Sequence, residues 1–273
     1  MDKSLLVRLV GFPATLIHGD TLVLDRWRWL KRRLPATRNG ERLIDIGCGT
    51  GAFSIGAARR GYEAVGLSWD ERNQRVAAER ATLCGVQTAR FEVVDVRNLD
   101  MRPDFIEQYD VAICCENIEH ILDDRKLLRD TAACLKPGGR LLLTTPFLLY
   151  RPMGAGEMGP FLPIENGDHV RRGYSAVMLE ELCQQAGLVP ERISFCSGVV
   201  SQKVTALMRA LSRIHPGLAW VATCPLRALP PLVDGIFTRL IGWPSFSICL
   251  EAYKPRFAVV RPPIDEDRYD LRQ

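Results

Sequence analysis

A dense cluster of glycines is the strongest chemical signal in the chain. An apolar run at residues 43–46 leads into Gly47, Gly49 and Gly51, and a helix-like segment follows from Ala52. Glycine lets the backbone approach a ligand closely, and the start of a helix attracts negative charge. The spacing Gly47-x-Gly49-x-x-Ala52 also fits the dinucleotide-binding fingerprint. The cluster therefore predicts a nucleotide-type ligand, with a tight turn that binds nothing as the alternative.

The neighbouring residues Glu119 and His120 are a second candidate for chemistry. Histidine is a natural general base near neutral pH. A hydroxyl group that acts as a nucleophile must lose a proton, so a base within hydrogen-bond reach assists the reaction. The alternative is a buried, hydrogen-bonded histidine at a helix start, where Asp123 and Asp124 favour the first turn.

Strand and helix patterns alternate from Glu41 onward, which predicts an α/β domain with a mainly parallel sheet. Strands are expected at 42–46, 64–67, 91–94, 109–115, 140–145, 189–195 and 247–253. Helices are expected at 52–60, 68–84, 123–135 and 175–186, with a turn at 136–139. Ser68 is expected to begin the second of these helices, and Glu71, three residues later, would complete a capping box.

The remaining segments fall outside this alternation. Residues 147–173 are rich in glycine and proline, and a loop of this length is usually functional or disordered. Residues 201–215 carry an apolar helical stripe. His18 lies in an apolar and aromatic stretch, and we expect surface or packing roles for it and for His215. We expect one domain, residues 1–273. Its expected parts are an N-terminal helical lid (1–40), a cofactor-binding core (41–195), a helical insert (196–246), a last strand (247–253) and a tail (254–273).

Four motifs follow one another along the chain. They are LIDIGCGTG at 43–51, VGLSWDERN at 65–73, FEVVDVRNL at 91–99, and YDVAICCENIEHILDD at 109–124 with LKPGGRLLLTTP at 135–146. In order and spacing they resemble the class I S-adenosylmethionine-dependent methyltransferases, over about residues 40–195 and the strand at 247–253. The resemblance implies a doubly wound, seven-stranded, Rossmann-like sheet with one antiparallel strand, and S-adenosyl-L-methionine as the cofactor.

The resemblance implies cofactor contacts by position. The methionine part would be held by a turn that Gly51 shapes, through Asp45 and the backbone of Gly47, Cys48 and Gly49.

At the other end of the cofactor, Asp95 would bond the adenine amine and Val96 would pack on the ring. Glu116, just past the fourth strand, would line the cofactor mouth. Asp95 could instead cap the turn before the next helix, and Glu116 could be a solvated strand end.

One position departs from the family pattern. The second strand usually ends on an acidic residue that holds both ribose hydroxyls, and here that position is Ser68. Some branches of the family use a hydroxyl residue there, so Ser68 can contact ribose or only cap the helix. Trp69 can stack near the adenine or serve in packing.

On the substrate side, Glu119-His120 resembles the Glu-His pair of ubiquinone-pathway O-methyltransferases, which makes His120 the candidate base and places Glu119 at the substrate cleft. Related enzymes carry a His-x-Arg-x-(Tyr/Phe) segment beside the substrate pocket. By that likeness His169 is a second catalytic candidate, and Arg171 and Tyr174 are candidates for substrate contact. A capped loop with solvated arginines is the alternative.

Composition excludes several classes of protein. The chain has 273 residues, 47% apolar and 25% charged, which is ordinary for a globular protein and excludes a disordered chain, a coiled coil or collagen. It contains no apolar run of about 18 residues that could span a membrane. The nine cysteines include no Cys-x-x-Cys spacing, and we predict no metal site. An odd count without a secretion signal favours the cytoplasm.

Charge is divided unevenly along the chain. Residues 1–42 carry nine basic and four acidic side chains, residues 43–199 carry 17 and 22, and residues 200–273 carry ten and six. Basic flanks can meet a membrane, an anionic substrate or nucleic acid. No Asn/Asp-Pro-Pro-Tyr motif follows the fourth strand, which disfavours nucleic-acid methylation. The stripe with Lys203, Arg209 and Arg213 can lie on a membrane, close a pocket or form a dimer seam.

We therefore expect transfer of a methyl group to a small-molecule acceptor, most simply to an oxygen. A lipid-like or quinone acceptor at the membrane surface is the second choice. Two other classes remain open: a nicotinamide-dependent oxidoreductase, and a non-catalytic relative that binds a partner through the basic flanks. The presence of Asp45, Gly47, Gly49 and Asp95 argues against the non-catalytic class.

Overall fold

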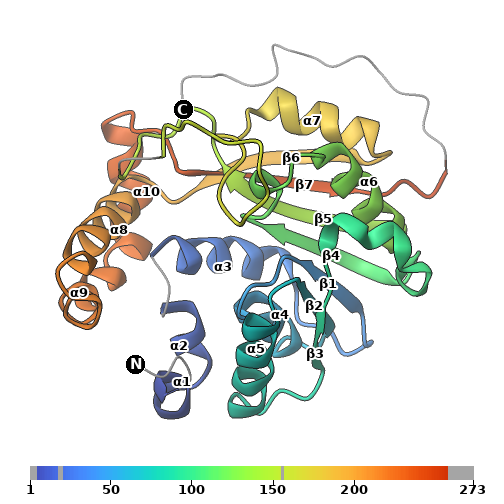
Figure 1. The fold of residues 1–273 in the computed structure, drawn as a ribbon, viewed down its shortest axis with the longest axis horizontal. Helices are drawn as coiled ribbons and strands as arrows, with labels where there is room; N and C mark the ends of the chain where they lie inside the picture. Colours follow the sequence, from blue (N-terminus) through green and yellow to red (C-terminus); the bar gives the residue numbers. More distant parts are fainter. Residues whose placement is uncertain (1–4, 18–20, 155–156, 258–273) are drawn as a thin grey trace.

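Seven strands form one sheet in the order β3-β2-β1-β4-β5-β7-β6 (Figure 1). The structure is a computed structural model that describes residues 5–17, 21–154 and 157–257. The strands are β1 (Arg42–Ile46), β2 (Glu63–Ser68), β3 (Ala89–Val93), β4 (Tyr109–Cys115), β5 (Leu135–Pro146), β6 (Val189–Cys196) and β7 (Ser247–Tyr253). Only β7 is antiparallel to its neighbours, β5 and β6. The predicted α/β fold, with a mainly parallel sheet and one antiparallel strand, is confirmed.

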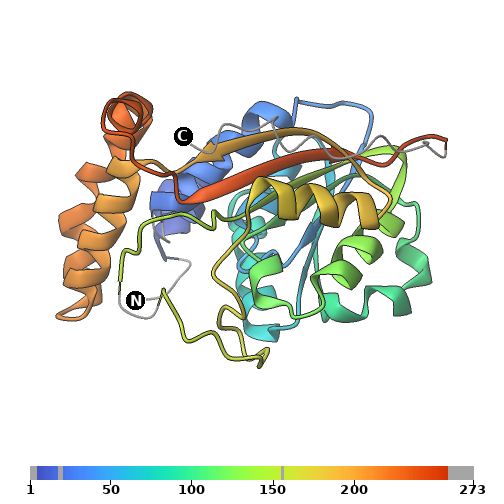
Figure 2. The ribbon, with the colours of Figure 1, turned by 90° about the horizontal axis from the view of Figure 1, so that it is seen from above.

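Helices cover both faces of this sheet (Figure 2). In chain order they are α1 (Leu5–Val10), α2 (Phe12–Ile17), α3 (Thr21–Arg33), α4 (Ala52–Ala58), α5 (Glu71–Leu83), α6 (Asp124–Cys134), α7 (Ala176–Gln185), α8 (Val199–Ser212), α9 (Pro216–Thr223) and α10 (Pro230–Leu240). Short 3₁₀ turns lie at η1 (Val96–Met101), η2 (Pro103–Phe105), η3 (Ile118–His120) and η4 (Pro225–Ala228).

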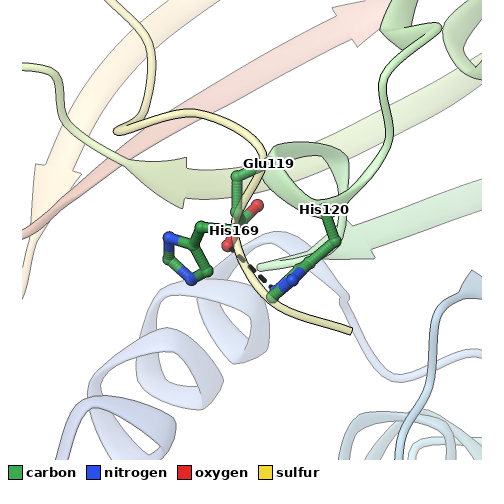
Figure 3. Close-up of side chains that lie close together, drawn as sticks. All are labelled: Glu119, His120 and His169. Atoms are coloured by element: carbon green, nitrogen blue, oxygen red, sulfur yellow. Dashed lines mark ion pairs between the residues drawn. The ribbon is translucent and has the colours of Figure 1, made fainter. Parts of the chain in front are cut away.

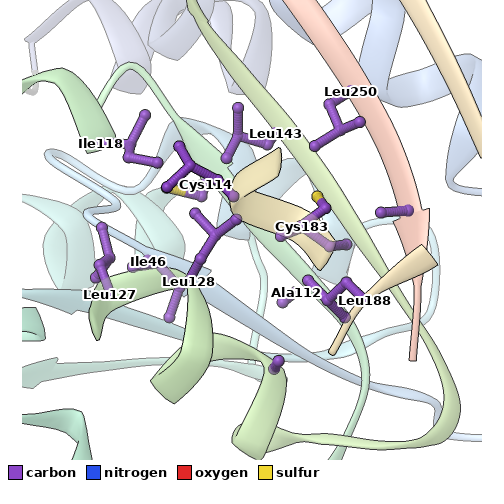
Figure 4. Packing of buried hydrophobic residues seen from close by; sticks show 14 of the residues in the cluster. Ile46, Ala112, Cys114, Ile118, Leu127, Leu128, Leu143, Cys183, Leu188 and Leu250 are labelled. Carbon is purple, nitrogen blue, oxygen red and sulfur yellow. The ribbon is translucent and has the colours of Figure 1, made fainter. Parts of the chain in front are cut away.

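Alternating side chains of the strands divide the core into two layers. Ile44 of β1 belongs to the cluster that includes α6 and α7, whereas its neighbour Leu43 belongs to the cluster that includes α3 and α4. Figure 4 shows part of the first cluster, where Leu128 and Cys183 from the helices lie near Leu143 of the sheet. Because both faces are covered, the strands read as nearly continuous apolar runs.

The start of α5 differs from the prediction. Ser68 does not begin this helix, because its backbone is still extended and pairs with Val93 of β3. The N-cap is Asp70, whose carboxylate accepts hydrogen bonds from the Arg72 and Asn73 amides at 2.8 and 3.1 Å. The Ser68 hydroxyl accepts the Asp70 amide at 3.2 Å. The predicted capping box is therefore wrong.

Residues 136–139 also differ from the predicted turn, because they lie inside β5. Tyr109 of β4 pairs with Leu135 and Val111 pairs with Arg140, so these four residues bulge out opposite one residue of the neighbouring strand. The positive φ of Gly138, 86°, accommodates this bulge.

The segment between β6 and β7 folds as α8, α9 and α10, which stand at one end of the sheet (Figures 1 and 2). His215 caps α9 by accepting the Leu218 amide at 3.1 Å. His18 and the end of the tail, 258–273, lie outside the described residues. Within the described ranges, no helix has the length and apolarity needed to cross a bilayer.

Candidate functional site

The turn from β1 to α4 forces three glycines into left-handed backbone conformations. Their φ angles are 80° at Gly47, 52° at Gly49 and 77° at Gly51. A Cβ at Gly47 would lie 2.4 Å from the Asn117 side chain, and one at Gly51 would lie 2.6 Å from the Phe91 ring. Among the residues that the structure describes, no heavy atom lies within 4 Å of a Cβ built at Gly49. Packing therefore requires the outer two glycines, whereas Gly49 borders open space that a ligand can approach.

Asp45, at the end of β1, is a buried carboxylate with one unused oxygen. Its Oδ2 accepts the Ser54 hydroxyl at 2.6 Å, whereas Oδ1 has no hydrogen-bond partner within the described part of the chain. Burial raises the pKa of this carboxyl to about 7. A positively charged or hydrogen-donating group beside the turn would satisfy the free oxygen and favour the ionised form. The site therefore fits the amino-acid end of S-adenosylmethionine.

Cys48 belongs to the turn itself. Its amide donates to the Leu67 carbonyl at 2.8 Å, and its carbonyl accepts the Gly51 amide at 2.9 Å. Its thiol lies 3.4 Å from Gln74 Oε1. These contacts hold the glycine cluster against β2 and α5.

The predicted adenine end is only partly open. Trp69 follows β2 and is 64% exposed, while Val96 is buried. Asp95 forms a two-pronged ion pair with Arg97, with Nη2–Oδ2 at 2.5 Å and Nε–Oδ1 at 2.8 Å. This pairing lowers the pKa of the Asp95 carboxyl. Arg97 also contacts Glu165 of the long loop, with Nη1–Oε2 at 2.6 Å. This bridge was not predicted, because Arg97 and Glu165 are 68 positions apart in the sequence.

Glu116, just after β4, has both carboxylate oxygens engaged by the protein. Oε1 accepts the hydroxyls of Thr144 and Ser247, each at 3.1 Å, and Oε2 lies 3.0 Å from Nη2 of Arg26 in α3. Its backbone φ is 50°, which is uncommon outside glycine. These contacts favour a role in anchoring α3 to the carboxyl end of β4, the central strand of the sheet.

Glu119, His120 and His169 converge after β4 (Figure 3). The rings of His120 and His169 meet edge to face, with centroids 4.6 Å apart and planes at 88°. His120 Nε2 lies 3.9 Å from Glu119 Oε1. The long loop is tied to this point because the Val170 amide donates to the Glu119 carbonyl at 3.0 Å. The structure thus brings together two histidines that are 49 positions apart in the sequence.

Burial sets the protonation of this cluster. The Glu119 side chain is fully buried, and desolvation together with the nearby Glu116 carboxylate raises its pKa well above the usual range. The Thr145 hydroxyl lies 3.1 Å from Glu119 Oε2. Burial, followed by the charge of His120, lowers the pKa of His169 to about 4, so His169 is a neutral imidazole near pH 7.

The same cluster has a donor set that suits a metal ion. One carboxylate and two imidazoles offer ligand atoms within 4.8 Å of one another. Such nitrogen and oxygen donors are ordinary ligands of zinc and of other divalent metals. The prediction of no metal site did not anticipate this arrangement, because His169 reaches the cluster from the long loop.

Arg171 and Tyr174 do not line the cavity described below, contrary to the predicted substrate contact. Arg171 forms an ion pair with Asp124, and Nη2 donates to the Ile121 and Leu122 carbonyls at 2.8 and 2.9 Å. Tyr174 is fully buried, and its hydroxyl donates to Asp124 Oδ2 at 2.9 Å. Both side chains hold the long loop against the start of α6.

A cavity of about 780 Å³ lies beside the histidine pair. Its walls come from the segment after β4, the long loop, α3, α8 and the residue before β7. The lining includes Leu22, Arg26, Glu116, Glu119, His120, Tyr150, Met153, Phe161, Leu162, Ile164, His169, Ala206, Arg209, Ala210, Arg213 and Phe246. Arg209 forms an ion pair with Glu157 across this cavity wall. The position of α3 agrees with the predicted N-terminal helical lid, whereas the aromatic residues of the lining were not predicted.

Comparison with known proteins gives a consistent relationship. The profile of the methyltransferase domain family matches residues 22–192. The chain is 32% identical over 149 residues to a ubiquinone biosynthesis O-methyltransferase of Marinobacter nauticus, covering 48% of this chain and 62% of that protein. A protein of the same name from Aeromonas salmonicida is 31% identical over 160 residues, covering 57% and 66%. The chain thus spans slightly less than two thirds of these relatives.

Solved structures share the fold at lower identity. Phosphoethanolamine N-methyltransferase 2 of Haemonchus contortus, in complex with S-adenosyl-L-methionine, has a TM-score of 0.60 at 20% identity over 93% of this chain and 60% of that one. The cyclase SpnF has a TM-score of 0.58 at 23% identity over 85% and 81%. Because these two proteins differ in reaction, the likeness speaks for the fold alone. The family match, which covers more than half of the sequence, shows that the chain belongs to the methyltransferase domain family, with the fold of the class I S-adenosylmethionine-dependent enzymes.

Proposed function

We propose that the chain transfers a methyl group from S-adenosylmethionine to a hydroxyl oxygen of a small molecule held in the 780 Å³ cavity. The observation that carries the proposal is the meeting of His120 and His169 on that cavity, past the end of β4. When bound, the cofactor supplies an electrophilic methyl group on a sulfonium sulfur.

The residues that would hold the cofactor lie along the ends of three parallel strands. Asp45 lies at the end of β1 and the turn at Gly47–Gly49 follows it. Ser68 ends β2 and Trp69 follows it, and Asp95 and Val96 follow β3. The carboxyl ends of parallel strands are the usual place for ligands in open α/β sheets. The free Oδ1 of Asp45 supports the amino-acid end of this assignment.

His120 is the proposed base, since it lines the cavity and its side chain is 26% exposed. It would take the proton from the acceptor hydroxyl as the oxygen attacks. His169 packs edge to face on its ring and fixes its orientation, and the buried Glu119 lies beside it. Correct placement of the two reactants supplies about 7–11 kcal/mol, more than the share of one base, so turnover should survive loss of His120 at a reduced rate.

A quinone-like or lipid-like acceptor is the second candidate. The relatives named for ubiquinone biosynthesis favour it. The apolar part of the cavity lining, which includes Leu22, Met153, Phe161, Leu162 and Phe246, also favours it. The protein would work in the cytoplasm, where its nine free cysteines stay reduced.

The test is methyl transfer from labelled S-adenosylmethionine into a metabolite extract, followed by identification of the labelled product. His120→Gln should lower turnover about a hundredfold or more at saturating acceptor. His215→Gln, which changes a histidine that only caps α9, is the matched control and should keep full turnover. Full activity of His120→Gln would refute the base assignment.

Two further measurements separate the alternatives. Calorimetry should show binding of S-adenosylhomocysteine and none of NAD, whereas the reverse result would favour an oxidoreductase. Activity should survive exhaustive dialysis against EDTA. Activity lost on dialysis and restored by a divalent ion would mean that the cluster of Glu119, His120 and His169 works as a metal site.

A further inference from the structure

The helix α10 carries apolar side chains on its solvent-facing side. Leu232, Ile236 and Leu240 recur every four residues, which places them on one helical face, and they are 74%, 61% and 76% exposed. Phe237 and Ile241, on the adjoining face, are 50% and 56% exposed. Single exposed apolar residues are ordinary on proteins, but a contiguous stripe of this kind marks an interaction surface.

The stripe continues into an apolar groove between α8 and α10. This groove, of about 370 Å³, is lined by Val199, Val200, Lys203, Val204, Leu207, Phe237 and Ile241. We call the stripe and the groove together the insert face.

The exposed charges of the insert face are positive. Residues 199–246 contain five basic residues and one acidic residue, Asp234, but Arg227 is buried and Arg209 and Arg213 line the 780 Å³ cavity. Asp234 is buried and accepts the Gly198 and Val200 amides, each at 2.7 Å, so it adds no negative charge to the surface. Lys203 and Arg239 are exposed.

A tryptophan stands at the border of this face. The ring of Trp243 has Arg151 on it at 4.2 Å and Lys203 at 4.5 Å from the centroid. Trp243 also donates from Nε1 to Gln202 Oε1 at 3.0 Å. Tryptophan and basic residues together are typical of protein surfaces that sit at the level of lipid headgroups.

We propose that the insert face docks on an anionic lipid bilayer. The apolar stripe would enter the boundary between headgroups and acyl chains, while the exposed basic residues would contact lipid phosphates. A second copy of the chain fits this face less well. Two such faces in contact would set Lys203 and Arg239 of each copy against the same basic surface, with no exposed carboxylate from residues 199–246 to neutralise them.

Docking would bring the cavity close to the lipid. A different face of α8, with Ala206, Arg209, Ala210 and Arg213, forms one wall of the 780 Å³ cavity. An amphiphilic acceptor could then pass from the bilayer into the cavity. Only this consequence rests on the proposed methyl transfer, because membrane binding by the insert face can be measured without any reaction.

The experiment is co-sedimentation of the full chain with vesicles of phosphatidylcholine alone or with one third phosphatidylglycerol, at low and high salt. We expect binding to the anionic vesicles at low salt and much weaker binding to neutral ones. Arg239→Gln should weaken partitioning about fivefold, the equivalent of ~1 kcal/mol for one basic residue. Ile236→Asp combined with Leu240→Asp should weaken it about tenfold or more, because two aliphatic side chains leave the interface.

Matched controls lie far from the insert. Met101→Asp changes a 74% exposed methionine in η1, and Arg125→Gln changes an exposed arginine in α6. Both controls should bind vesicles as the unchanged chain does, and all variants should retain binding of S-adenosylhomocysteine. No binding to anionic vesicles, or an equal loss in the controls, would overturn the proposal. So would a dimer in analytical ultracentrifugation that the Ile236→Asp, Leu240→Asp variant dissociates, because the insert face would then be a dimer interface.

Discussion

The Asp45 carboxyl is 1% exposed, and burial raises its pKa from 3.8 to about 7. Above about pH 4, this carboxyl should therefore lower the free energy of unfolding of the ligand-free protein, relative to a side chain that does not ionise. The unfolded chain ionises this group above about pH 4, whereas the folded chain does so only near pH 7. Its contribution to stability is therefore fully present below the unfolded pKa and is lost as the pH rises through the folded pKa. At about 1.4 kcal/mol for each pKa unit, the loss is about 4 kcal/mol near pH 8 and about 2 kcal/mol near pH 5.

Asp45→Asn removes the ionisation and keeps an acceptor for the Ser54 hydroxyl. Urea denaturation of the ligand-free protein should show a higher free energy of unfolding for the variant, by up to about 4 kcal/mol near pH 8 and about 2 kcal/mol near pH 5. Calorimetry on the same variant should show weaker binding of S-adenosylhomocysteine, because the carboxylate is the proposed partner of its amino group. Function and stability would then change in opposite directions at one residue.

Ser54→Ala is the matched control, because it removes the hydroxyl that lies 2.6 Å from Asp45 Oδ2 and leaves the carboxyl in place. This variant should be less stable than the unchanged chain by about 1–3 kcal/mol, the effect of leaving a buried acceptor unpaired. A gain for Asp45→Asn that is equal at the two pH values, or a loss near pH 8, would refute the reasoning.

Three other predictions concern packing, titration and the long loop. Gly56→Ala should lower the free energy of unfolding by about 1–3 kcal/mol in urea denaturation, because its Cβ would lie 2.3 Å from the Trp27 ring. Gly235→Ala in α10, with nothing within 4 Å, should instead raise it by up to about 1 kcal/mol. His169 has a pKa lowered to about 4, so the unchanged chain should lose stability as the pH falls from about 6.5 toward 4, and thermal melts of His169→Asn should show a smaller loss. Glu165→Gln removes the charge that pairs with Arg97 and ties the long loop to η1. This variant should raise the KM for the acceptor about threefold to tenfold with little change in kcat. An unchanged KM in steady-state assays would contradict this prediction.

Local patterns were sufficient to predict the sheet. The strands at 42–46, 109–115 and 247–253 have the predicted limits, since each is an apolar run bounded by turn residues. Local rules were insufficient where two of them competed. At Ser68 the hydroxyl made a plausible cap, but pairing with β3 kept the backbone extended and left Asp70 to cap the helix.

The candidate site was predictable only in part for a similar reason. Asp45 and the glycine turn are contiguous in sequence, so one motif defines them. The contact of His120 with His169 depends on how the long loop folds back, and no periodicity records that. The same holds for Arg26, which reaches Glu116 from α3. Tyr174 was assigned to the substrate by likeness to other proteins, but the interior of the protein buries it.

The antiparallel pairing of β6 and β7 has a consequence for how this chain can change over evolutionary time. Two antiparallel neighbours can be joined by a two-residue hairpin, yet here the connection is the whole segment 197–246. Loop-closure entropy grows only with the logarithm of length, so this longer connection costs about 3 kcal/mol more than a hairpin would. This segment packs against α3, and none of its residues belongs to the turn between β1 and α4 that carries the glycines. On the roles proposed above, replacing this one segment would change acceptor preference and membrane contact while the glycine turn after β1 stays in place.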